Sequence, residues 1–366
     1  MTGTDATIDT TETSADAFAE RVFGAVLGAQ EVHAIYLGDR LGWYRALATH
    51  GPLTSVELAE RTGSTERYAR EWLEHQAVSG YLTFDDVDAP ATERRYQLPE
   101  AHAEVLTDDD SLAFLTPLAQ FVAAVGQHID KIAAAYRDGG GVSWAELGAD
   151  ARAAQGAANR ALFLHQLGQE LLPAAPELHE RLRAGGRVAD IGCGLAWSAI
   201  GIARSYPTVT VDGFDIDEPS IEAGRRNASD HGVADRVQLH AVDAADVVPA
   251  EPYDVVFAFE CIHDLADPVA VLATMRRLAG ADGAVVVMDE RVADRFTAPG
   301  SELERLFYGY SLTCCLPDGM SHTPSAGTGT VMRTDTLAAY AREAGFSGVE
   351  ILPIEHDTFR FYQLRQ

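Results

Sequence analysis

The second half of the chain alternates short apolar runs with longer stretches in which apolar residues recur at helical spacing. Five apolar runs lie at residues 188–191, 209–215, 239–243, 253–260 and 283–288. Short runs of this kind, separated by helical patterns, predict a parallel sheet with helices on both faces. The central part of the run at 253–260, Val-Val-Phe-Ala-Phe, is apolar throughout, as expected of a strand buried on both sides. This half is therefore predicted to be one α/β domain, and Thr334 is expected as the N-cap of its last helix.

The first third of the chain shows a different pattern, in which helical periodicity gives way to short extended segments. Apolar residues recur at helical spacing over residues 17–47, which predicts helices with a buried stripe. Two shorter helices follow, and Thr54 and Ser64 are expected as their N-caps because each is followed by a glutamate in the first turn. Two strands, at 80–84 and 95–98, complete the outline of a winged helix-turn-helix.

These patterns divide the chain into four parts. They are a disordered tail at residues 1–15, a winged-helix domain at 16–110, a helical connector at 111–180 and the α/β domain at 181–366. The tail consists mostly of Thr, Ser and Asp, with almost nothing to bury. The connector is expected to form helices at 112–136 and 149–172, separated by three glycines at 139–141. With 366 residues the chain exceeds what one core normally holds, so two domains are expected.

A glycine-rich turn after the first strand of the α/β domain is the most informative motif. Asp190-x-Gly192-x-Gly194 joins a strand to a helix, and glycine lets the backbone turn sharply against a ligand. Asp215 ends the next strand about twenty residues later, where an acid can take both hydroxyls of a ribose. A dinucleotide site would need a third glycine where Trp197 stands, and Asp190 would repel a pyrophosphate. The acid suits a ligand with a sulfonium and an ammonium group, so the motif favours S-adenosylmethionine over NAD.

With these motifs in this order, residues 181–366 resemble the class I S-adenosylmethionine-dependent methyltransferases. The whole chain looks like the actinobacterial-type small-molecule methyltransferases that carry an N-terminal winged-helix domain. The resemblance implies a Rossmann-like seven-stranded sheet in an α/β fold, with the runs at 349–353 and 358–364 as its antiparallel edge. It also implies methyl transfer to a small-molecule acceptor, with O-methylation favoured over N- or C-methylation. The connector would then form a lid over the acceptor, with aromatic residues such as Phe163 as candidate wall residues and ordinary core packing as their alternative role.

The donor-binding residues are assigned by type and place. Gly192 and Gly194 let the methionine part approach the backbone, and Asp190 anchors the turn and faces the ammonium group. Asp215 is expected to take the ribose hydroxyls, with Asp217 as the second choice. The remaining members are Asp243 and Ala244, which the resemblance places at the adenine, together with Ile216 and Glu260.

His263 and Asp264 follow directly after the fourth strand, at the sheet edge where ligands bind in open α/β folds. The pair resembles the His-Asp motif of winged-helix O-methyltransferases, in which the histidine deprotonates the acceptor hydroxyl. A histidine with a pKa near neutrality suits that task. Glu290, which ends the fifth strand, would orient the histidine or line the acceptor site. The alternative is that His263 only caps a helix or shapes the pocket, because many methyltransferases act by proximity alone.

A metal site is another interpretation of the same residues. His263, Asp264 and a second histidine would form the two-His-one-carboxylate face found in some methyltransferases that methylate α-keto acids on carbon. His322 is the one downstream histidine in a loop expected near the active site. Ligand geometry cannot be derived from so long a separation in sequence, and we assign no metal site.

The charge of the chain bears on its partners. The formal net charge is −27, and Lys131 is the only lysine, so the chain repels nucleic-acid phosphates unless it has a local basic face. The second helix of the helix-turn-helix carries Arg67 and Arg70, but three glutamates accompany them. The charge therefore counts against DNA binding. The resemblance to small-molecule methyltransferases that use the same module for dimerisation implies a homodimer through the winged helix. A winged-helix regulator that senses S-adenosylmethionine or another ligand remains the alternative. A nucleic-acid methyltransferase would carry an Asn/Asp-Pro-Pro-aromatic motif, which is missing.

Cysteine usage and hydropathy indicate the compartment. The four cysteines, Cys193, Cys261, Cys314 and Cys315, form no paired framework and have no zinc-ligand spacing. No apolar run approaches the roughly 18 residues of a membrane span, and no signal peptide is recognised. A cytoplasmic enzyme without a membrane partner is expected.

Overall fold

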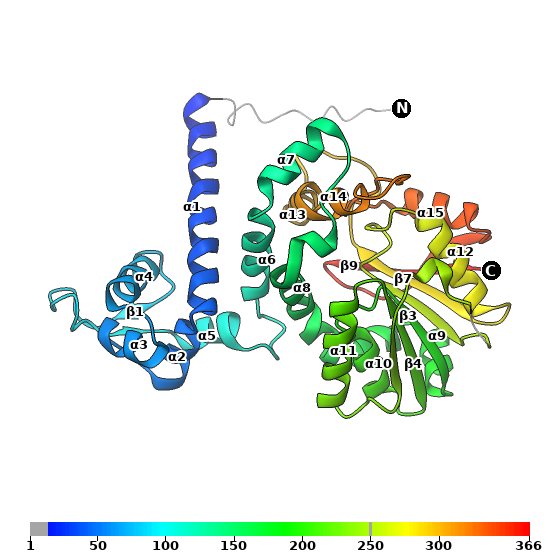
Figure 1. Cartoon of the computed structure of the whole chain (residues 1–366), viewed down its shortest axis with the longest axis horizontal. Coiled ribbons are helices and arrows are strands. Elements are labelled where there is room, and N and C mark those ends of the chain that lie inside the picture. The colour runs from blue at the N-terminus through cyan, green and yellow to red at the C-terminus, as the bar shows by residue number, and fades with distance from the viewer. Residues whose placement is uncertain (1–13, 249–250) are drawn as a thin grey trace. The chain divides into compact units, whose positions relative to one another are not determined.

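The computed structural model describes residues 14–248 and 251–366, and the chain separates into two compact units (Figure 1). The first unit ends at Ala123, and the second runs from Ala124 to Gln366. Most of the predicted disordered tail, residues 1–13, lies outside the described residues. The conformation of this tail and the predicted limit at residue 110 stay predictions.

The first unit is a helical domain with a two-stranded wing. Its helices are α1 (Ala15–Arg40), α2 (Trp43–His50), α3 (Ser55–Thr62), α4 (Glu66–Val78) and α5 (Glu100–Thr107), and its strands β1 (Thr83–Phe84) and β2 (Tyr96–Gln97) pair antiparallel. A core that includes Tyr44, Leu58 and Leu73 joins α2, α3 and α4. Thr54 forms a capping box with Glu57 at the start of α3, so the N-cap predicted there is confirmed.

The connector is helical, with one more break than the sequence predicted. Its elements are α6 (Thr116–Gly126), which spans the division between the units, α7 (Ile129–Asp138), α8 (Trp144–Ala161), a π-helical segment (Leu162–Leu171), a 3-10 turn (Leu172–Ala174) and α9 (Pro176–Arg183). The helix expected to run from residue 112 to 136 is divided at Gln127 and His128, whose amides bond three residues back and form a turn. α8 begins earlier than expected because Ser143 forms a capping box with Glu146.

A seven-stranded sheet forms the centre of the second unit, and its strand order is β5-β4-β3-β6-β7-β9-β8. The strands are β3 (Gly186–Ile191), β4 (Val209–Asp215), β5 (Val237–Ala241), β6 (Val255–Phe259), β7 (Ala284–Glu290), β8 (Gly348–Ile351) and β9 (Phe359–Arg365). β3 to β7 are parallel, whereas β9 runs antiparallel to both β7 and β8. The predicted α/β fold with its antiparallel edge is confirmed. From β3 the chain adds β4 and β5 on one side and then β6 and β7 on the other, so the strand order reverses between β3 and β6. In open α/β sheets such a switch point opens a crevice for a ligand.

Helices cover both faces of this sheet. The helices that follow the strands are α10 (Trp197–Ser205), α11 (Glu218–Asp230), α12 (Pro268–Ala279) and α15 (Thr334–Glu343). Successive strand residues point to opposite faces. Val286 packs with the core that contains α9, α10 and α11, whereas its neighbour Val287 packs with the core that contains α12 and α15. Because the helices cover the faces of the sheet, the loops that follow the strands lie at its carboxyl edge.

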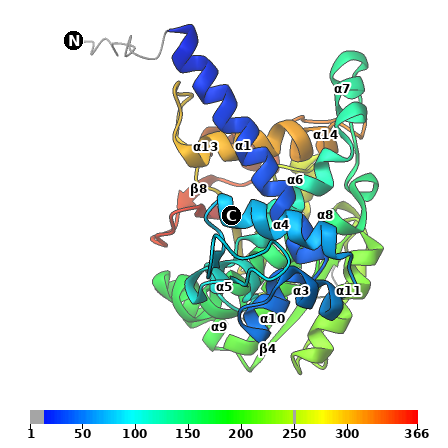
Figure 2. The same ribbon diagram turned by 90° about the vertical axis from the view of Figure 1, so that its left-hand side faces the viewer.

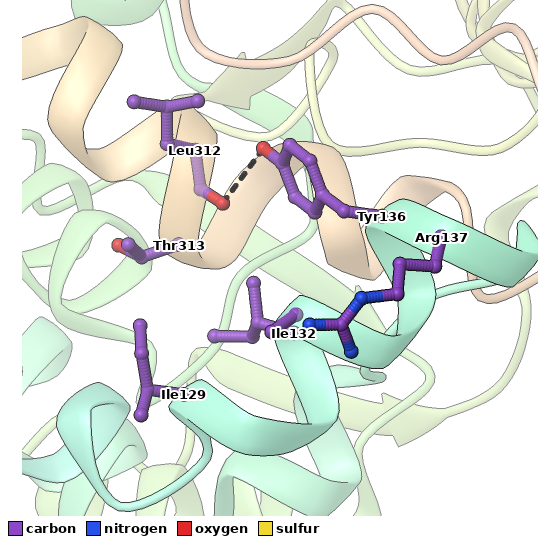
Figure 3. A pocket seen from close by; sticks show the side chains of 7 residues that line it. Ile129, Ile132, Tyr136, Arg137, Leu312 and Thr313 are labelled. Atoms are coloured by element: carbon purple, nitrogen blue, oxygen red, sulfur yellow. Dashed lines mark hydrogen bonds between the residues drawn. The ribbon is translucent and has the colours of Figure 1, made fainter.

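A last helical group stands beside α7. It consists of α13 (Glu302–Tyr310), a π-helical segment (Ser311–Cys315) and α14 (Leu316–Gly319). Tyr136 of α7 donates its hydroxyl to the carbonyl of Leu312, with 3.0 Å between the oxygens. Around this bond lies an open, mostly apolar groove lined also by Ile129 and Ile132 (Figure 3). The bond ties α7 to the segment that ends at Cys315.

Two predicted N-caps are wrong. α4 begins after Thr65, which makes no capping bond, because the hydroxyl of Ser64 lies 3.2 Å from the indole nitrogen of Trp43. α15 begins after Arg333, and the hydroxyl of Thr334 bonds that of Tyr362 instead. In both cases a tertiary contact takes the side chain expected to cap the helix.

Within residues 14–248 and 251–366, no helix is both long and apolar enough to cross a bilayer.

Candidate active site

The glycine-rich turn joins β3 to α10 through three residues with left-handed backbone. Gly192 has φ +69°, Gly194 has φ +49° and Ala196 has φ +66°. A Cβ at Gly192 would lie 2.7 Å from the sulfur of Cys261, so both the conformation and the space require glycine. Ala196 holds a conformation that non-glycine residues seldom adopt, which is typical of a functional site.

Asp215 lies against this turn. One carboxylate oxygen accepts a hydrogen bond from the amide of Gly194 at 2.8 Å, and the other accepts from the amide of Asp217 at 2.8 Å. The fold thus brings together the glycine turn and the acid that the sequence places about twenty residues later. Burial raises the pKa of Asp215 above its ordinary value, although both amide bonds oppose the shift.

Asp190 is buried beneath the turn. Its carboxylate accepts a 2.6 Å hydrogen bond from the hydroxyl of Ser198, in the first turn of α10. Burial raises the pKa of Asp190 to about 7. Its second oxygen has no hydrogen-bond partner among the described residues. Asp190 therefore anchors the turn to α10 and keeps one oxygen unpaired.

The other expected donor-binding residues lie at neighbouring strand ends. Asp243 follows β5 and caps a short 3-10 turn (Ala244–Asp246) by accepting from the amide of Ala245 at 2.8 Å. Ile216 is 71% exposed beside Asp215. Glu260 follows β6 with φ +52°, a strained value for a non-glycine residue. Burial and the neighbouring charge of Glu290 raise the pKa of Glu260.

His263 is buried among carboxylates at the carboxyl end of β6. Its Nδ1 lies 2.8 Å from Asp289 and 3.1 Å from Glu290, and its Nε2 lies 3.3 Å from Asp264. The structure therefore brings together the three residues predicted for catalysis, His263, Asp264 and Glu290. Asp289 makes the shortest contact, and sequence reasoning missed it. The adjacent acids at the end of the 283–290 segment were the available signal, because Asp289 stands directly before Glu290, which the sequence did select.

The carboxylates control the charge of the histidine. Burial lowers the pKa of His263, but the charges of Asp264, Asp289 and Glu290 outweigh it and hold the pKa well above its ordinary value. An imidazole in this setting binds a proton tightly. This pKa differs from the near-neutral value expected from the sequence, because three carboxylates surround the ring. Only the neutral form of the imidazole can take a proton from a hydroxyl, and the carboxylates then stabilise the imidazolium.

More polar side chains extend from this cluster toward α8. The thiol sulfur of Cys315 lies within 4.8 Å of the ligand atoms of His263 and Asp264. Asp318 accepts a 2.7 Å bond from the amide of Trp144, and burial raises its pKa to about 7. Phe163, one of the aromatic residues expected to line an acceptor wall, is buried and packs edge-on against a phenylalanine of β6.

Two groups in the described part of the chain have the donor atoms of a metal site. His263 belongs to both, once with Asp264 and Cys315 and once with Asp289 and Glu290, and the ligand atoms within each group lie within 4.8 Å of one another. His322, the second histidine weighed for a metal face, is in neither group. The fold does not bring the two histidines together as that interpretation required.

Two family models match this chain. Residues 182–315 match a model described as a methyltransferase domain, and residues 32–108 match an Rv2258c-like winged HTH domain. The ubiquinone biosynthesis O-methyltransferase of Neisseria meningitidis serogroup C is 36% identical over 109 residues, which cover 29% of this chain. The chain spans 44% of the length of that relative.

Solved structures match nearly the whole chain. The mitomycin 7-O-methyltransferase MmcR superposes with a TM-score of 0.72 at 23% identity, over 97% of this chain and 99% of that one. An O-methyltransferase of neocarzinostatin biosynthesis, solved with S-adenosyl-L-homocysteine and 1,4-dihydroxy-2-naphthoic acid, superposes with a TM-score of 0.64 at 19% identity, over 92% and 95%. The chain therefore carries a methyltransferase domain behind an N-terminal winged-helix domain, on the class I S-adenosylmethionine-dependent methyltransferase fold.

Proposed function

We propose that the protein is an S-adenosylmethionine-dependent O-methyltransferase that acts on a small molecule. The observation that carries this proposal is the position of His263. It stands at the carboxyl end of β6, the strand next to β3 and its glycine turn, with Nδ1 bonded to Asp289. A basic histidine beside a donor-binding turn is suited to methyl transfer to a hydroxyl, because it can take the proton that the hydroxyl loses.

The residues around the turn fit the donor. Gly192 and Gly194 leave room for its methionine part, and Asp215 lies at the turn with oxygens suited to the ribose hydroxyls. The unpaired oxygens of Asp190 and Glu260 are suited to its positive groups. Asp243 and Ala244 are assigned to the adenine, and Ile216 offers exposed apolar surface beside Asp215. Asp217 is not assigned to the ribose, because both of its carboxylate oxygens already accept hydrogen bonds from Arg152.

The histidine cluster supplies the proton chemistry. With Nδ1–H donated to Asp289, Nε2 can take the proton of the acceptor hydroxyl. The resulting imidazolium is stabilised by Asp264, Asp289 and Glu290, whose charges raise the pKa of His263. When bound, S-adenosylmethionine supplies the methyl group, which forms a bond to the acceptor oxygen while the electrons of its bond to sulfur stay on sulfur.

The acceptor class follows from two considerations. A base is needed for a hydroxyl, which has a proton to lose at the attacking oxygen. The two structural neighbours named above are O-methyltransferases of mitomycin and neocarzinostatin biosynthesis, and one holds a hydroxylated naphthoic acid. We infer a hydroxylated, partly apolar metabolite as the acceptor.

The N-terminal domain is proposed to join two copies of the chain. Along α1 five large apolar side chains are 48–62% exposed: Phe18, Val22, Phe23, Val26 and Leu27. An apolar stripe of that length favours association with an apolar partner. In α4, by contrast, Arg67 pairs with Glu71 and Arg70 with Glu66, so the charge of this helix is mixed rather than basic. A second copy is therefore favoured over DNA as the partner, and four free cysteines support a cytoplasmic location.

Transfer of labelled methyl from S-adenosylmethionine tests the proposed activity. The protein is incubated with a protein-free, nuclease-treated metabolite extract and, in parallel, with DNA and RNA. Label in a small molecule that is lost on chemical cleavage of methyl ethers or methyl esters supports the proposal. Label in nucleic acid, or donor binding without transfer to any tested hydroxyl compound, would contradict it, and the second result would favour a ligand-sensing regulator.

A further inference from the structure

One face of α8 contacts four residues around the donor half of the site. Arg152, Gly156, Asn159 and Arg160 follow one another at intervals of four, three and one residues, so they lie on the same side of the helix. Their partners, in the same order, are Asp217, Leu195, Glu260 and Trp197. α8 lies beside α11 in both views of the ribbon (Figures 1 and 2).

The contact of Arg152 is the strongest of the four. Its Nε and one terminal nitrogen donate to the two oxygens of Asp217 at 2.6 and 2.8 Å. The side chains are only 15% and 7% exposed. A two-pronged bond between a guanidinium and a carboxylate fixes direction as well as distance, and partial burial limits screening by solvent. Burial opposes ionisation of Asp217, but Arg152 and Ser220 lower its pKa below the ordinary value.

Asp217 connects Arg152 with the donor turn. Its carboxylate caps α11 by accepting from the amide of Ser220, and its own amide donates to Asp215. The other oxygen of Asp215 accepts from the amide of Gly194. A continuous series of hydrogen bonds therefore runs from α8 to the glycine turn, and Arg152 is its outer end.

A kink at Gly148 separates the first turn of α8 from the part of the helix that contacts the donor turn. Gly148 has φ +84° and ψ −168°, which interrupts the helix four residues before Arg152. Only glycine adopts these angles without strain. Gly156 sits so close to the turn that a Cβ there would lie 2.7 Å from a methyl of Leu195. The position of residues 152–160 against the glycine turn is therefore set by their own contacts, because the kink at Gly148 disconnects them from the first turn of α8.

We propose that Arg152 is a positioning residue for the donor: its two-pronged bond to Asp217 ties α8 to the glycine turn, sets the carboxylate of Asp215 and slows the exit of the bound nucleoside. This inference rests on the proposed function, because it takes Asp215 as the ribose ligand. Arg152 touches no reacting atom. Its loss should therefore act on donor affinity and residence time, with little effect on the methyl-transfer step.

Binding of S-adenosylhomocysteine to the full chain tests the proposal without needing an acceptor. Titration and stopped-flow displacement are run on the wild type, Arg152→Ala, Arg152→Lys and Asp217→Asn. Asparagine retains an oxygen to cap α11, so Asp217→Asn removes the charge and keeps the cap. Arg365→Ala, which removes an exposed pair with Glu350 on β8, is the control.

The proposal expects Arg152→Ala to raise both the dissociation constant and the dissociation rate about tenfold, with a smaller change for Arg152→Lys. Asp217→Asn should have a similar effect, and the double variant should be no worse than either single one. The control should match the wild type. Affinity and dissociation rate within twofold of wild type in folded Arg152→Ala would overturn the proposal, even if its melting temperature fell. A wild-type protein that binds no S-adenosylhomocysteine would instead overturn the proposed function.

Discussion

At the scale of single residues, the account depends on His263 and the acids around it. The sequence was sufficient to select His263, Asp264 and Glu290, because a polar group after a buried strand stands where ligands bind. It was not sufficient to select Asp289 as the partner of Nδ1. Asp289 and Glu290 both contact Nδ1, and which of the two lies closer depends on how β7 pairs with β6.

Asp289→Asn should change the pH dependence of the reaction in a defined direction. Loss of the charge destabilises the imidazolium, so the pKa of His263 falls and the neutral base is present at lower pH. The limb of the kcat/KM profile that rises with pH should move down by about one pH unit, while the maximal rate falls roughly 100-fold.

The matched control for this variant is Asp294→Asn, an 81% exposed acid paired with Arg360. Its profile should superpose on that of the wild type. A limb in Asp289→Asn that stays in place or moves to higher pH would remove Asp289 from the proposed role.

At the scale of elements, the strands, the wing and the capping box at Thr54 followed from local pattern. The two wrong caps, at Ser64 and Thr334, show where local pattern fails: each hydroxyl bonds a distant aromatic residue instead. The π-helical segments gave no sequence signal, because they depend on packing between helices. For the same reason the alignment of α8 over the donor turn could not be predicted.

Gly192→Ala should lower the free energy of unfolding by more than its backbone strain alone, because the added methyl also collides with Cys261. Gly232 has nearly the same φ, +68°, and no atom lies within 4 Å of the place that an added Cβ would take, so Gly232→Ala measures the backbone cost alone. We expect that cost to be about 1 kcal/mol. Gly192→Ala should lose a further ~1–3 kcal/mol because its methyl collides with Cys261.

Chemical denaturation and titration with S-adenosylhomocysteine measure both effects. Only Gly192→Ala should lose affinity for the ligand. Equal stability losses with unchanged affinity would show that the turn can rearrange and that glycine is not needed for the donor.

At the scale of the whole molecule, a change in the spacing of apolar residues along the chain predicted a winged helix followed by an α/β domain. What remained open was the use of the winged helix. Net charge argued against nucleic acid, and the structure adds paired arginines on α4 and an exposed apolar stripe on α1.

Phe23→Asp combined with Val26→Asp should convert a dimer into a monomer, because charge on the α1 stripe opposes its burial in a partner. Light scattering coupled to size-exclusion chromatography gives the mass directly. Val78→Asp, at an 89% exposed valine on α4, should leave the dimer intact. A wild-type monomer at micromolar concentration would contradict the proposed role of α1.

The most direct test of the account is the rate of methyl transfer by His263→Ala at saturating S-adenosylmethionine, with the acceptor recovered from the metabolite extract. His240→Ala is the control, since His240 is an exposed histidine bonded to Asp212. We predict that transfer by His263→Ala falls by about 10²–10⁴ while S-adenosylhomocysteine binds as tightly as to the wild type, and that His240→Ala is fully active. Transfer by His263→Ala at the wild-type rate would contradict the assignment of His263 as the general base.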